Sequence, residues 1–567
     1  MTKLYLYHQD RIRKVVNTIL IFGLIILSRF FYIQVLQADL NAEEISNLIK
    51  YRKIIKGERG KIYDRNGIPL AENITKGDFW VDTNKELDIG AIAKFFYHYF
   101  SLDSAETSIY LKNKKTNYLP IKKNVTLDNI EEINKKVKKI KGLNLDRYSQ
   151  RIYRYGEVCS HLIGYVDMDG NGKSGVEYQF DYILKGKKKS QELLKTIDNR
   201  LINKEKEKFS SDLYGKDISL TIDIHLQRIL YDAIQKGQVE SNSKSANGII
   251  LNPHTGEILA MAGSPSYDPN NYMKYDIKYF KNNSISEQYE PGSTIKVIPI
   301  LDILSLEEEN QPLKFDCEKG EHKLPGTNVI IHDHDPYEIL SLDEVLIYSS
   351  NIGVSKISML LGKEKIYSSL KKFGIGSKTG IDLPGEEDGV VRDIKKWSKI
   401  SHSMASIGQE ISTTNLQLAM IYGAIANNGY LLKPILIKKI EDYFDDKLFK
   451  TEVIRKVATK EDSKKIINIL TRAVNDGTGT NAKIPGYQIA GKTGTAEKFI
   501  NGEYSEKYFV SSFASIFPSE SPQYVCIVSA DSPEYYKHWG NMTAAPIVQE
   551  IYKGIIENDF LLVSQEF

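Results

Sequence analysis

The sequence predicts a multi-domain protein: a single N-terminal transmembrane helix, an elongated α+β pedestal, and a C-terminal α/β domain with an antiparallel sheet flanked by helices. Three observations predict this arrangement. The chain has 567 residues, which is too long for one ordinary domain. An apolar run near the N-terminus has the length needed to cross a bilayer. Strand-like segments lie on both sides of a helical region in the second half of the chain, which favours one sheet built from both.

The predicted membrane anchor is "VVNTILIFGLIILSRFFYIQVL", residues 15–36. Basic residues precede this run and acidic residues follow it: Lys3, Arg11, Arg13 and Lys14 before, and Asp39, Glu43 and Glu44 after. By the positive-inside rule, residues 1–14 are a cytoplasmic tail and the bulk of the chain lies outside the cytoplasm. A cleaved signal peptide is the alternative, but "LQADLNAEE" offers a poor small-x-small cleavage site, so we expect an uncleaved anchor.

Residues 37–214 are predicted to form the non-catalytic pedestal, because they are rich in Lys and Asn and low in long apolar runs. Within it, "GERGKIYDRNGIPLAEN" (57–73) places strand residues around an Asn-Gly pair and predicts a hairpin. "HLIGYVDMDGNGKSGVEYQFDYIL" (161–184) predicts a loop that enters a helix. Its "DMDGNG" resembles the start of an EF-hand loop but lacks the closing glutamate, so we do not expect calcium there.

The C-terminal domain is placed at residues 215–567. "NGIILNPHTGEILAMAGSP" (247–265) predicts strand, tight turn at His254-Thr255-Gly256, and strand. A helical region follows Ser293, and "GYQIAGKTGTAEK", "YFVSSFASIF" and "QYVCIVSAD" predict strands near the end. We therefore expect one antiparallel sheet that gathers both ends of this domain.

Composition argues against several functions. The net charge of +3 gives no support for nucleic-acid binding. The three cysteines are far apart, without metal-like spacing, and their apolar neighbours predict plain buried thiols. "IHDHDP" (331–336) alternates His and Asp, but adjacent ligands on one loop rarely close a metal site alone. We expect neither a metal nor a cofactor.

"YEPGSTIKVIPI" (289–300) is the first candidate for chemistry. Pro291-Gly292 predicts a turn into a buried helix, which would place Ser293 at the helix start and Lys296 one turn further on the same face. The plain alternative is a capping serine beside a surface lysine. The same Ser-x-x-Lys spacing begins at three other serines, Ser241, Ser368 and Ser369, so the spacing alone is weak evidence.

Two further motifs favour nucleophilic catalysis. "YSSNIG" supplies Ser349 and Asn351, and "AGKTGTAEK" supplies Lys492, Thr493, Gly494 and Thr495. Acyl transfer needs an activated hydroxyl, a base, a proton donor to the leaving group and an oxyanion hole.

Each requirement has a candidate. Ser293 is the predicted nucleophile and Lys296 its base, provided that burial and a nearby cation lower the lysine pKa. Ser349 is the predicted proton relay, and the Asn351 amide is expected to hold the substrate's peptide group. The predicted site for a substrate carboxylate is Lys492 with Thr493, Gly494 and Thr495, and the backbone N–H groups of Ser293 and Thr495 are the expected oxyanion hole.

A second Lys-Thr-Gly, at Lys378 to Gly380, competes with the copy at Lys492. It lies in "FGIGSKTGIDLPGE", between Gly-rich turns and before Pro384-Gly385, which predicts a loop. The copy at Lys492 follows an apolar stretch and precedes strand-like segments. We therefore assign the function to Lys492.

These motifs, together with "RGKIYDRNG", "SGVEYQFD", "NPHTGEILAMAGSPSYDPN" and "SIGQEISTTNLQLAMIYGAIANNG", resemble class B penicillin-binding proteins in order, from residue 15 to about 550. The resemblance implies a serine β-lactamase-like transpeptidase domain. It implies a D,D-transpeptidase that cross-links peptidoglycan stem peptides through a serine acyl-enzyme and that is acylated by β-lactams.

The segments "GKTGTAEKFINGEYSEKYFVSSFASIFP" and "GNMTAAPIVQEIYKGI" look more like the division-specific FtsI type than the elongation type. This resemblance implies a single-pass protein of a Gram-negative inner membrane, with a periplasmic catalytic domain and septal partners: a glycan polymerase of the SEDS family and other divisome proteins. Alternatives are an elongation-type enzyme, or a scaffold that mainly regulates the polymerase. A β-lactam sensor should carry several spans, and a β-lactamase should be about half this length.

Overall fold

The computed structural model describes residues 2–38, 50–113, 116–126, 129–195, 201–203, 213–304, 313–442, 446–500 and 502–561. The chain divides into two compact units. One comprises Met1–Gly57 and Gly186–Tyr214, and the other Glu58–Lys185 and Gly215–Phe567. Each unit is described by itself.

The first unit contains the apolar N-terminal helix. Helix α1 (Thr2–Phe31) continues as the π-helical turn η1 (Tyr32–Leu36), and the segment Gln9–Leu36 is long and apolar enough to cross a membrane. Its large apolar side chains are exposed, as an anchor in lipid requires. The acidic flank expected at Asp39, Glu43 and Glu44 lies outside the described residues. Strands β1 (Lys50–Lys56), β6 (Lys188–Lys195) and β7 (Leu201–Asn203) form an antiparallel sheet in the order β1-β6-β7.

The second unit is built on a five-stranded antiparallel sheet of order β10-β9-β23-β22-β21. Its strands are β9 (Ser245–Leu251), β10 (Ile258–Ser264), β21 (Ala490–Ile500), β22 (Glu503–Phe517) and β23 (Tyr524–Asp531). The prediction of one antiparallel sheet gathering strands from both ends of the domain is confirmed. So is the turn before β10, where Gly256 has a φ of 77°.

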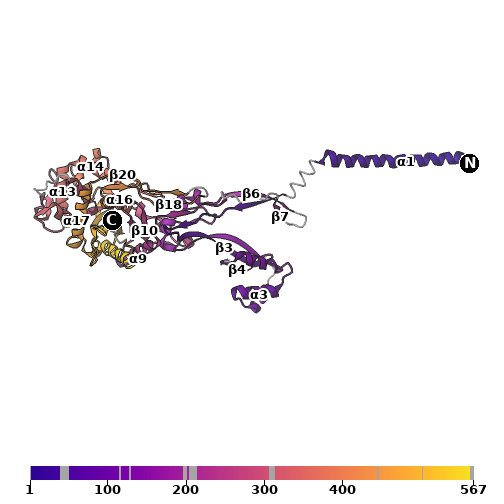
Figure 1. The fold of residues 1–567 in the computed structure, drawn as a ribbon, viewed down its shortest axis with the longest axis horizontal. Coiled ribbons are helices and arrows are strands. Elements are labelled where there is room, and N and C mark those ends of the chain that lie inside the picture. The colour runs from indigo at the N-terminus through magenta and orange to yellow at the C-terminus, as the bar shows by residue number, and fades with distance from the viewer. Residues whose placement is uncertain are drawn as a thin grey trace, which may run out of the picture. The chain divides into compact units, whose positions relative to one another are not determined.

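Helices cover both faces of this sheet. Leu230 and Ile234 of α9 (Ile224–Glu240) contact the position where a Cβ on Gly248 would lie, and Leu251 approaches Gly423 of α16 (Asn415–Ala426). Because residues 248 and 251 point to opposite faces of β9, α9 and α16 lie on opposite sides. In Figure 1 the yellow C-terminal helix α18 (Ala544–Glu557) lies beside α9, and the two pack together.

The helical region expected after Ser293 is confirmed. It comprises α11 (Val297–Leu304), α12 (Leu342–Ile347), α13 (Asn351–Leu361), α14 (Lys363–Lys372), α15 (Ser401–Ser406) and, after α16, α17 (Lys460–Asn475), which packs against β21. Strand pairs β11–β14 (Lys314–Asp316, Ile339–Ser341), β12–β13 (Glu321–Lys323, Ile330–His332), β15–β16 (Val390–Val391, Ile411–Ser412) and β17–β20 (Tyr430–Leu432, Val453–Lys456) lie between these helices in sequence.

A second sheet joins pedestal strands to strands of the C-terminal region. Its order is β19-β18-β8-β2-β3-β4, with β5 on the other edge of β3. The strands are β2 (Ile62–Tyr63), β3 (Pro69–Val81), β4 (Leu119–Thr126), β5 (Leu143–Tyr153), β8 (Ile218–Leu220), β18 (Ile437–Ile440) and β19 (Lys447–Leu448). The hairpin predicted around Asn66-Gly67 is confirmed as β2–β3.

The outer part of the pedestal has its own core. Helices α3 (Ile89–Phe100), α4 (Ser104–Lys112) and α5 (Ile130–Val137) surround Phe79, Phe95 and Phe96, whose rings meet edge-on or tilted at 5.4–5.8 Å. These aromatic contacts are separate from the larger core around the five-stranded sheet.

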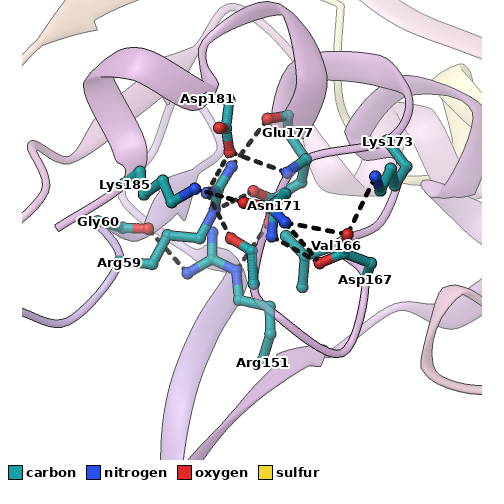
Figure 2. A network of polar contacts seen from close by, with 12 residues as sticks. Arg59, Gly60, Arg151, Val166, Asp167, Asn171, Lys173, Glu177, Asp181 and Lys185 are labelled. Carbon is teal, nitrogen blue, oxygen red and sulfur yellow. Dashed lines mark hydrogen bonds and ion pairs between the residues drawn. The ribbon is translucent and has the colours of Figure 1, made fainter. Parts of the chain in front are cut away.

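A buried polar network joins further segments of the pedestal region (Figure 2). Glu177, on the short helix α7 (Gly175–Gln179), is 0% exposed and accepts from Arg59 at 2.5 Å and Arg151 at 2.7 Å. Arg59 also contacts Asp181 of α8 (Asp181–Leu184) at 2.6 Å. The loop predicted at "DMDGNG" closes on itself, since Asn171 donates to Asp167. These contacts join segments 59, 151 and 171–181 of the second unit.

Candidate active site

Ser293 lies on a tight turn beside strand β21. Gly292 to Lys296 form the 3-10 helix η6, which continues into α11, so the expected helix start is confirmed. Gly292 has a φ of 53°, and a Cβ there would lie 3.0 Å from the carbonyl oxygen of Thr495. Only glycine combines this backbone conformation with such a close approach. The turn therefore brings the backbone of Ser293 next to the backbone of Thr495.

Lys296 is fully buried beneath this turn. Its Nζ donates to the carbonyl oxygen of Ser349 at 2.6 Å, to Oδ1 of Asn351 at 2.7 Å, and to Oγ of Ser349 at 3.3 Å. Burial disfavours the ammonium form and lowers the pKa of Lys296 to about 7, although the charge of Asp333 opposes this shift. An amine with this pKa is partly neutral at physiological pH and can accept a proton.

Ser349 is held in an uncommon conformation between two amines. Its φ is 63°, in the left-handed region, which non-glycine residues adopt mainly where the surroundings fix them. Its hydroxyl accepts from Lys492 at 2.9 Å in addition to Lys296. The serine hydroxyl thus joins the two lysines.

Asp333 anchors this segment, and sequence reasoning missed it. Its carboxylate accepts from the hydroxyl of Ser350 at 2.6 Å and from the backbone N–H groups of Asn351 and Ile352 at 2.5 and 3.0 Å. These donors form the N-terminus of α13, where a carboxylate is favoured. The alternating "IHDHDP" motif was the feature of the sequence that could have pointed to Asp333. Its central aspartate holds the Ser349–Asn351 segment, and within the described residues no His, Cys, Asp and Glu side chains form a group of metal-binding size.

Lys492 lies on β21 and is also fully buried. Its Nζ reaches Ser349 and the hydroxyls of Thr478 at 3.4 Å and Thr493 at 3.5 Å. Burial, followed by the charge of Lys296, lowers the pKa of Lys492 well below its ordinary value. The nearby cation expected beside Lys296 is Lys492, since both amines donate to the hydroxyl of Ser349. Repulsion between two close amines is mutual, so each lysine disfavours the charged form of the other.

Gly494 allows strand β21 to pack closely against the turn of Ser293. A Cβ at Gly494 would lie 2.3 Å from Oγ of Ser512 and 2.8 Å from the carbonyl oxygen of Pro291. Any side chain there would push β21 away from Ser293. The hydroxyl of Thr495 accepts from the backbone N–H of Gly540 at 3.0 Å, which fixes its rotamer.

These residues border a cleft of about 750 Å³. Ser293, Ser349, Asn351, Thr493 and Thr495 line it, and the two lysine amines lie beneath. Gln409 also lines the cleft.

The cleft has a wall that sequence reasoning missed. Phe509 stacks on His538 at 4.2 Å, and tilted ring contacts continue from His538 to Trp539 at 4.5 Å and from Trp539 to His334 at 5.0 Å. Thr478 also lines the cleft. These residues come from strand β22 and from loops distant in sequence, so no local pattern predicts their convergence.

The alternative motifs lie in other settings. Lys378 to Gly380 form a loop in which the backbone N–H and hydroxyl of Thr379 donate to Glu386 at 2.6 Å, as predicted for this copy. Ser241 is buried at the end of α9 and donates to the carbonyl oxygen of Gly237 at 2.6 Å. Cys159, Cys317 and Cys526 are free and buried, as expected.

The arrangement can perform nucleophilic acyl transfer. Ser293 lines the cleft, a low-pKa amine lies one helical turn further along the chain, a second serine accepts from two amines, and Gly292 packs against the backbone of Thr495. The fold and the site are those of an acyl-transferring serine enzyme.

Comparison with known proteins agrees with this class. Residues 248–553 match the penicillin binding protein transpeptidase domain, and residues 54–220 match the penicillin-binding protein dimerisation domain. The chain belongs to the class B penicillin-binding protein family and is a serine-type transpeptidase.

Relatives span nearly the whole chain. It is 31% identical to the stage V sporulation protein D of Bacillus subtilis, over 96% of this chain and 85% of that protein. It is 30% identical to the peptidoglycan D,D-transpeptidase FtsI of Escherichia coli, over 94% of this chain and 89% of that protein. Among solved structures, penicillin binding protein 2X from Streptococcus thermophilus shares the fold with a TM-score of 0.75 at 24% identity, covering 89% of this chain and 80% of that one.

Proposed function

We propose that this chain is a peptidoglycan D,D-transpeptidase that cross-links stem peptides during septal wall synthesis. The observation that carries the proposal is the junction at Ser349, whose hydroxyl accepts from both buried lysines beside the turn of Ser293. Its relatives include proteins named peptidoglycan D,D-transpeptidase, which supports the substrate class.

In the acylation step, the Oγ of Ser293 attacks the carbonyl carbon of the penultimate D-Ala while Lys296 takes the hydroxyl proton. The backbone N–H groups of Ser293 and Thr495 stabilise the oxyanion. Lys492, Thr493 and Thr495 hold the terminal carboxylate; this negative charge restores the proton affinity of Lys492. Asn351 orients the peptide group.

The tetrahedral intermediate then collapses. The C–N bond breaks, the proton passes through Ser349 to the leaving nitrogen, and the last D-Ala departs. An amine of a neighbouring stem peptide attacks the acyl-enzyme, loses a proton to the same relay, and releases Ser293 with a new amide bond. A β-lactam acylates Ser293 by the same first step.

We further infer a single-pass protein with a cytoplasmic tail (1–14), an inner-membrane anchor (15–36), a periplasmic pedestal (37–214) and a transpeptidase domain (215–567). A membrane glycan polymerase of the SEDS family and other division proteins are the inferred partners. One relative bears the name FtsI and another a sporulation name, and the likeness to FtsI supports a septal role, with an elongation-type enzyme or a regulatory scaffold as alternatives.

The chemistry is tested by covalent labelling with a fluorescent penicillin. Ser293→Ala should abolish labelling while the protein remains folded by circular dichroism. Ser368→Ala is the matched control, since this exposed serine has the same spacing to a lysine. Stable labelling of the Ser293 variant would contradict the assignment.

The cellular role is tested separately by depletion. Loss of a septal enzyme should give long filaments without completed septa. Rounded cells would instead indicate the elongation role. A Ser293→Ala protein that restored normal division in depleted cells would indicate a scaffold.

A further inference from the structure

Glu290 lies three residues before Ser293 and links three parts of the active-site region. Its Oε1 accepts from the backbone N–H of Glu410 at 2.9 Å and from the hydroxyl of Tyr504 at 3.0 Å. Tyr504 lies near the start of β22, where the hairpin β21–β22 extends beyond the sheet. One carboxyl oxygen thus connects the nucleophile turn, the loop after α15 and the hairpin end.

The segment before Ser293 depends on this loop for its position. Tyr289 and Thr413 exchange two backbone hydrogen bonds, at 3.0 and 2.9 Å, and the N–H of Gly292 donates to Gly408 at 3.3 Å. A Cβ on Gly408 would lie 2.2 Å from the carbonyl oxygen of Gly292. Glu290 sits between these backbone contacts, so its side chain continues the same attachment toward the hairpin.

The second oxygen of Glu290 is unusual. Oε2 is buried and has no hydrogen-bond partner within the part of the chain that the structure describes. An anionic oxygen in that position loses its solvation without compensation, whereas a protonated carboxyl group loses much less.

The two neighbouring carboxylates also disfavour the anionic form of Glu290. Glu410 and Glu497 face it, and Arg392 is paired with Glu410. Burial is the largest cause and raises the pKa of Glu290 to about 7, against the N–H of Glu410 and the hydroxyl of Tyr504, which favour the anion. An exposed glutamate titrates near ~4.3.

We propose that Glu290 is a positioning residue for the nucleophile: in its neutral form it joins the turn of Ser293 to the hairpin end at Tyr504, and its ionisation releases that end. Proton linkage gives the direction of the pH effect on this equilibrium. The carboxyl group binds a proton more tightly in the joined state than in a solvated, released state, so protonation stabilises the joined state. The released state gains population as pH rises through about 7.

Hydrogen exchange of the hairpin end directly tests this contact between Glu290 and Tyr504, which we call the latch. In the wild type, the protection factors of residues 503–508 should fall by about tenfold between pH 6 and pH 8, the usual size for loss of one such contact. Glu290→Gln keeps the acceptor oxygen and cannot ionise, so protection should stay high at both pH values. In Tyr504→Phe, residues 503–508 should have low protection at both pH values. Tyr508→Phe changes a residue on the same exposed strand end and should behave as the wild type.

Acylation by a fluorescent penicillin supplies the second readout and rests on the proposed function. Glu290→Ala should lose about tenfold in acylation rate, because the turn loses its attachment, and Glu290→Gln should restore most of that rate. The latch is overturned if Glu290→Gln keeps the wild-type pH dependence of protection, or if it acylates as slowly as Glu290→Ala. Failure of the wild type to label would instead contradict the proposed function.

Discussion

Two clusters of buried charge lie in the second unit, and they are built in opposite ways. In the pedestal, Arg59 and Arg151 meet the carboxylate of Glu177, with Asp181 beside Arg59 (Figure 2). In the cleft, Lys296 and Lys492 share the hydroxyl of Ser349. The first cluster pairs opposite charges, whereas the second brings two amines together.

The difference appears in the pKa values. In the pedestal, burial acts against the charge of Arg59, but Glu177 and Asp181 outweigh it and raise its pKa. In the cleft, burial lowers the pKa of both lysines, and the carboxylate of Asp333 offsets this only in part at Lys296. Compensated charges hold segments together, whereas uncompensated amines become neutral enough to exchange protons.

The largest expected effect is at Lys296. Lys296→Arg keeps the positive charge but cannot deprotonate, so acylation should be lost across the neutral range while the protein still folds. In the wild type the acylation rate should rise with pH through about 7, because the amine becomes neutral above its pKa. The measurement is the acylation rate against pH by stopped-flow fluorescence. Near wild-type acylation by the arginine variant at pH 7 would place the base elsewhere.

A smaller loss is expected at Lys492. Lys492→Ala removes the donor to Ser349 and the cation that would meet the substrate carboxylate, so acylation should slow by about 10²-fold. Lys378→Ala, in the loop copy of the motif, is the matched control and should leave the rate unchanged. Stopped-flow acylation again provides the measurement. A larger loss in Lys378→Ala than in Lys492→Ala would refute the assignment of function to Lys492.

The pedestal cluster should respond in stability and leave the chemistry intact. Glu177→Gln leaves two buried guanidinium groups with one carboxylate fewer, which should lower the free energy of unfolding by about 3 kcal/mol. Asp181→Asn should cost less, because Asp181 is 29% exposed and contacts one of the two arginines. Denaturant unfolding measures both, and acylation per folded molecule should match the wild type. A catalytic defect in folded Glu177→Gln protein would break the distinction between the two clusters.

The smallest effect is expected at Asp333, the carboxylate that offsets part of the pKa shift of Lys296. Asp333→Asn weakens three hydrogen bonds to the start of α13, so acylation at high pH should fall by about tenfold. It also removes the charge that raises the pKa of Lys296, so the midpoint of the pH–rate profile should move to lower pH. A fall in rate with an unmoved midpoint would mean that Asp333 acts through geometry alone.

Local patterns predicted much of the architecture. The apolar run at 15–36, the Asn-Gly hairpin at β2–β3 and the turn at Gly256 follow from periodicity and turn chemistry, which act over a few residues. The choice between the two Lys-Thr-Gly copies also followed from local context. The position of Ser293 on a tight turn depended on Gly292, whose requirement is visible in "PGS".

Long-range contacts decided the rest. Asp333 reaches Asn351 across 18 residues, and Tyr504 reaches Glu290 across 214. Hydrophobic periodicity and turn signals act over a few residues, so they cannot predict contacts between segments this far apart in sequence.

Residue types and their local spacing predict which side chains have the chemistry for acyl transfer and which elements carry them. The folded arrangement of distant segments is what buries Lys296 and Lys492 and leaves one carboxyl oxygen of Glu290 buried with no hydrogen-bond partner among the described residues. The physical reason is that solvation and charge interactions depend on every atom within a few ångströms, and in a folded chain most of those atoms come from segments distant in sequence.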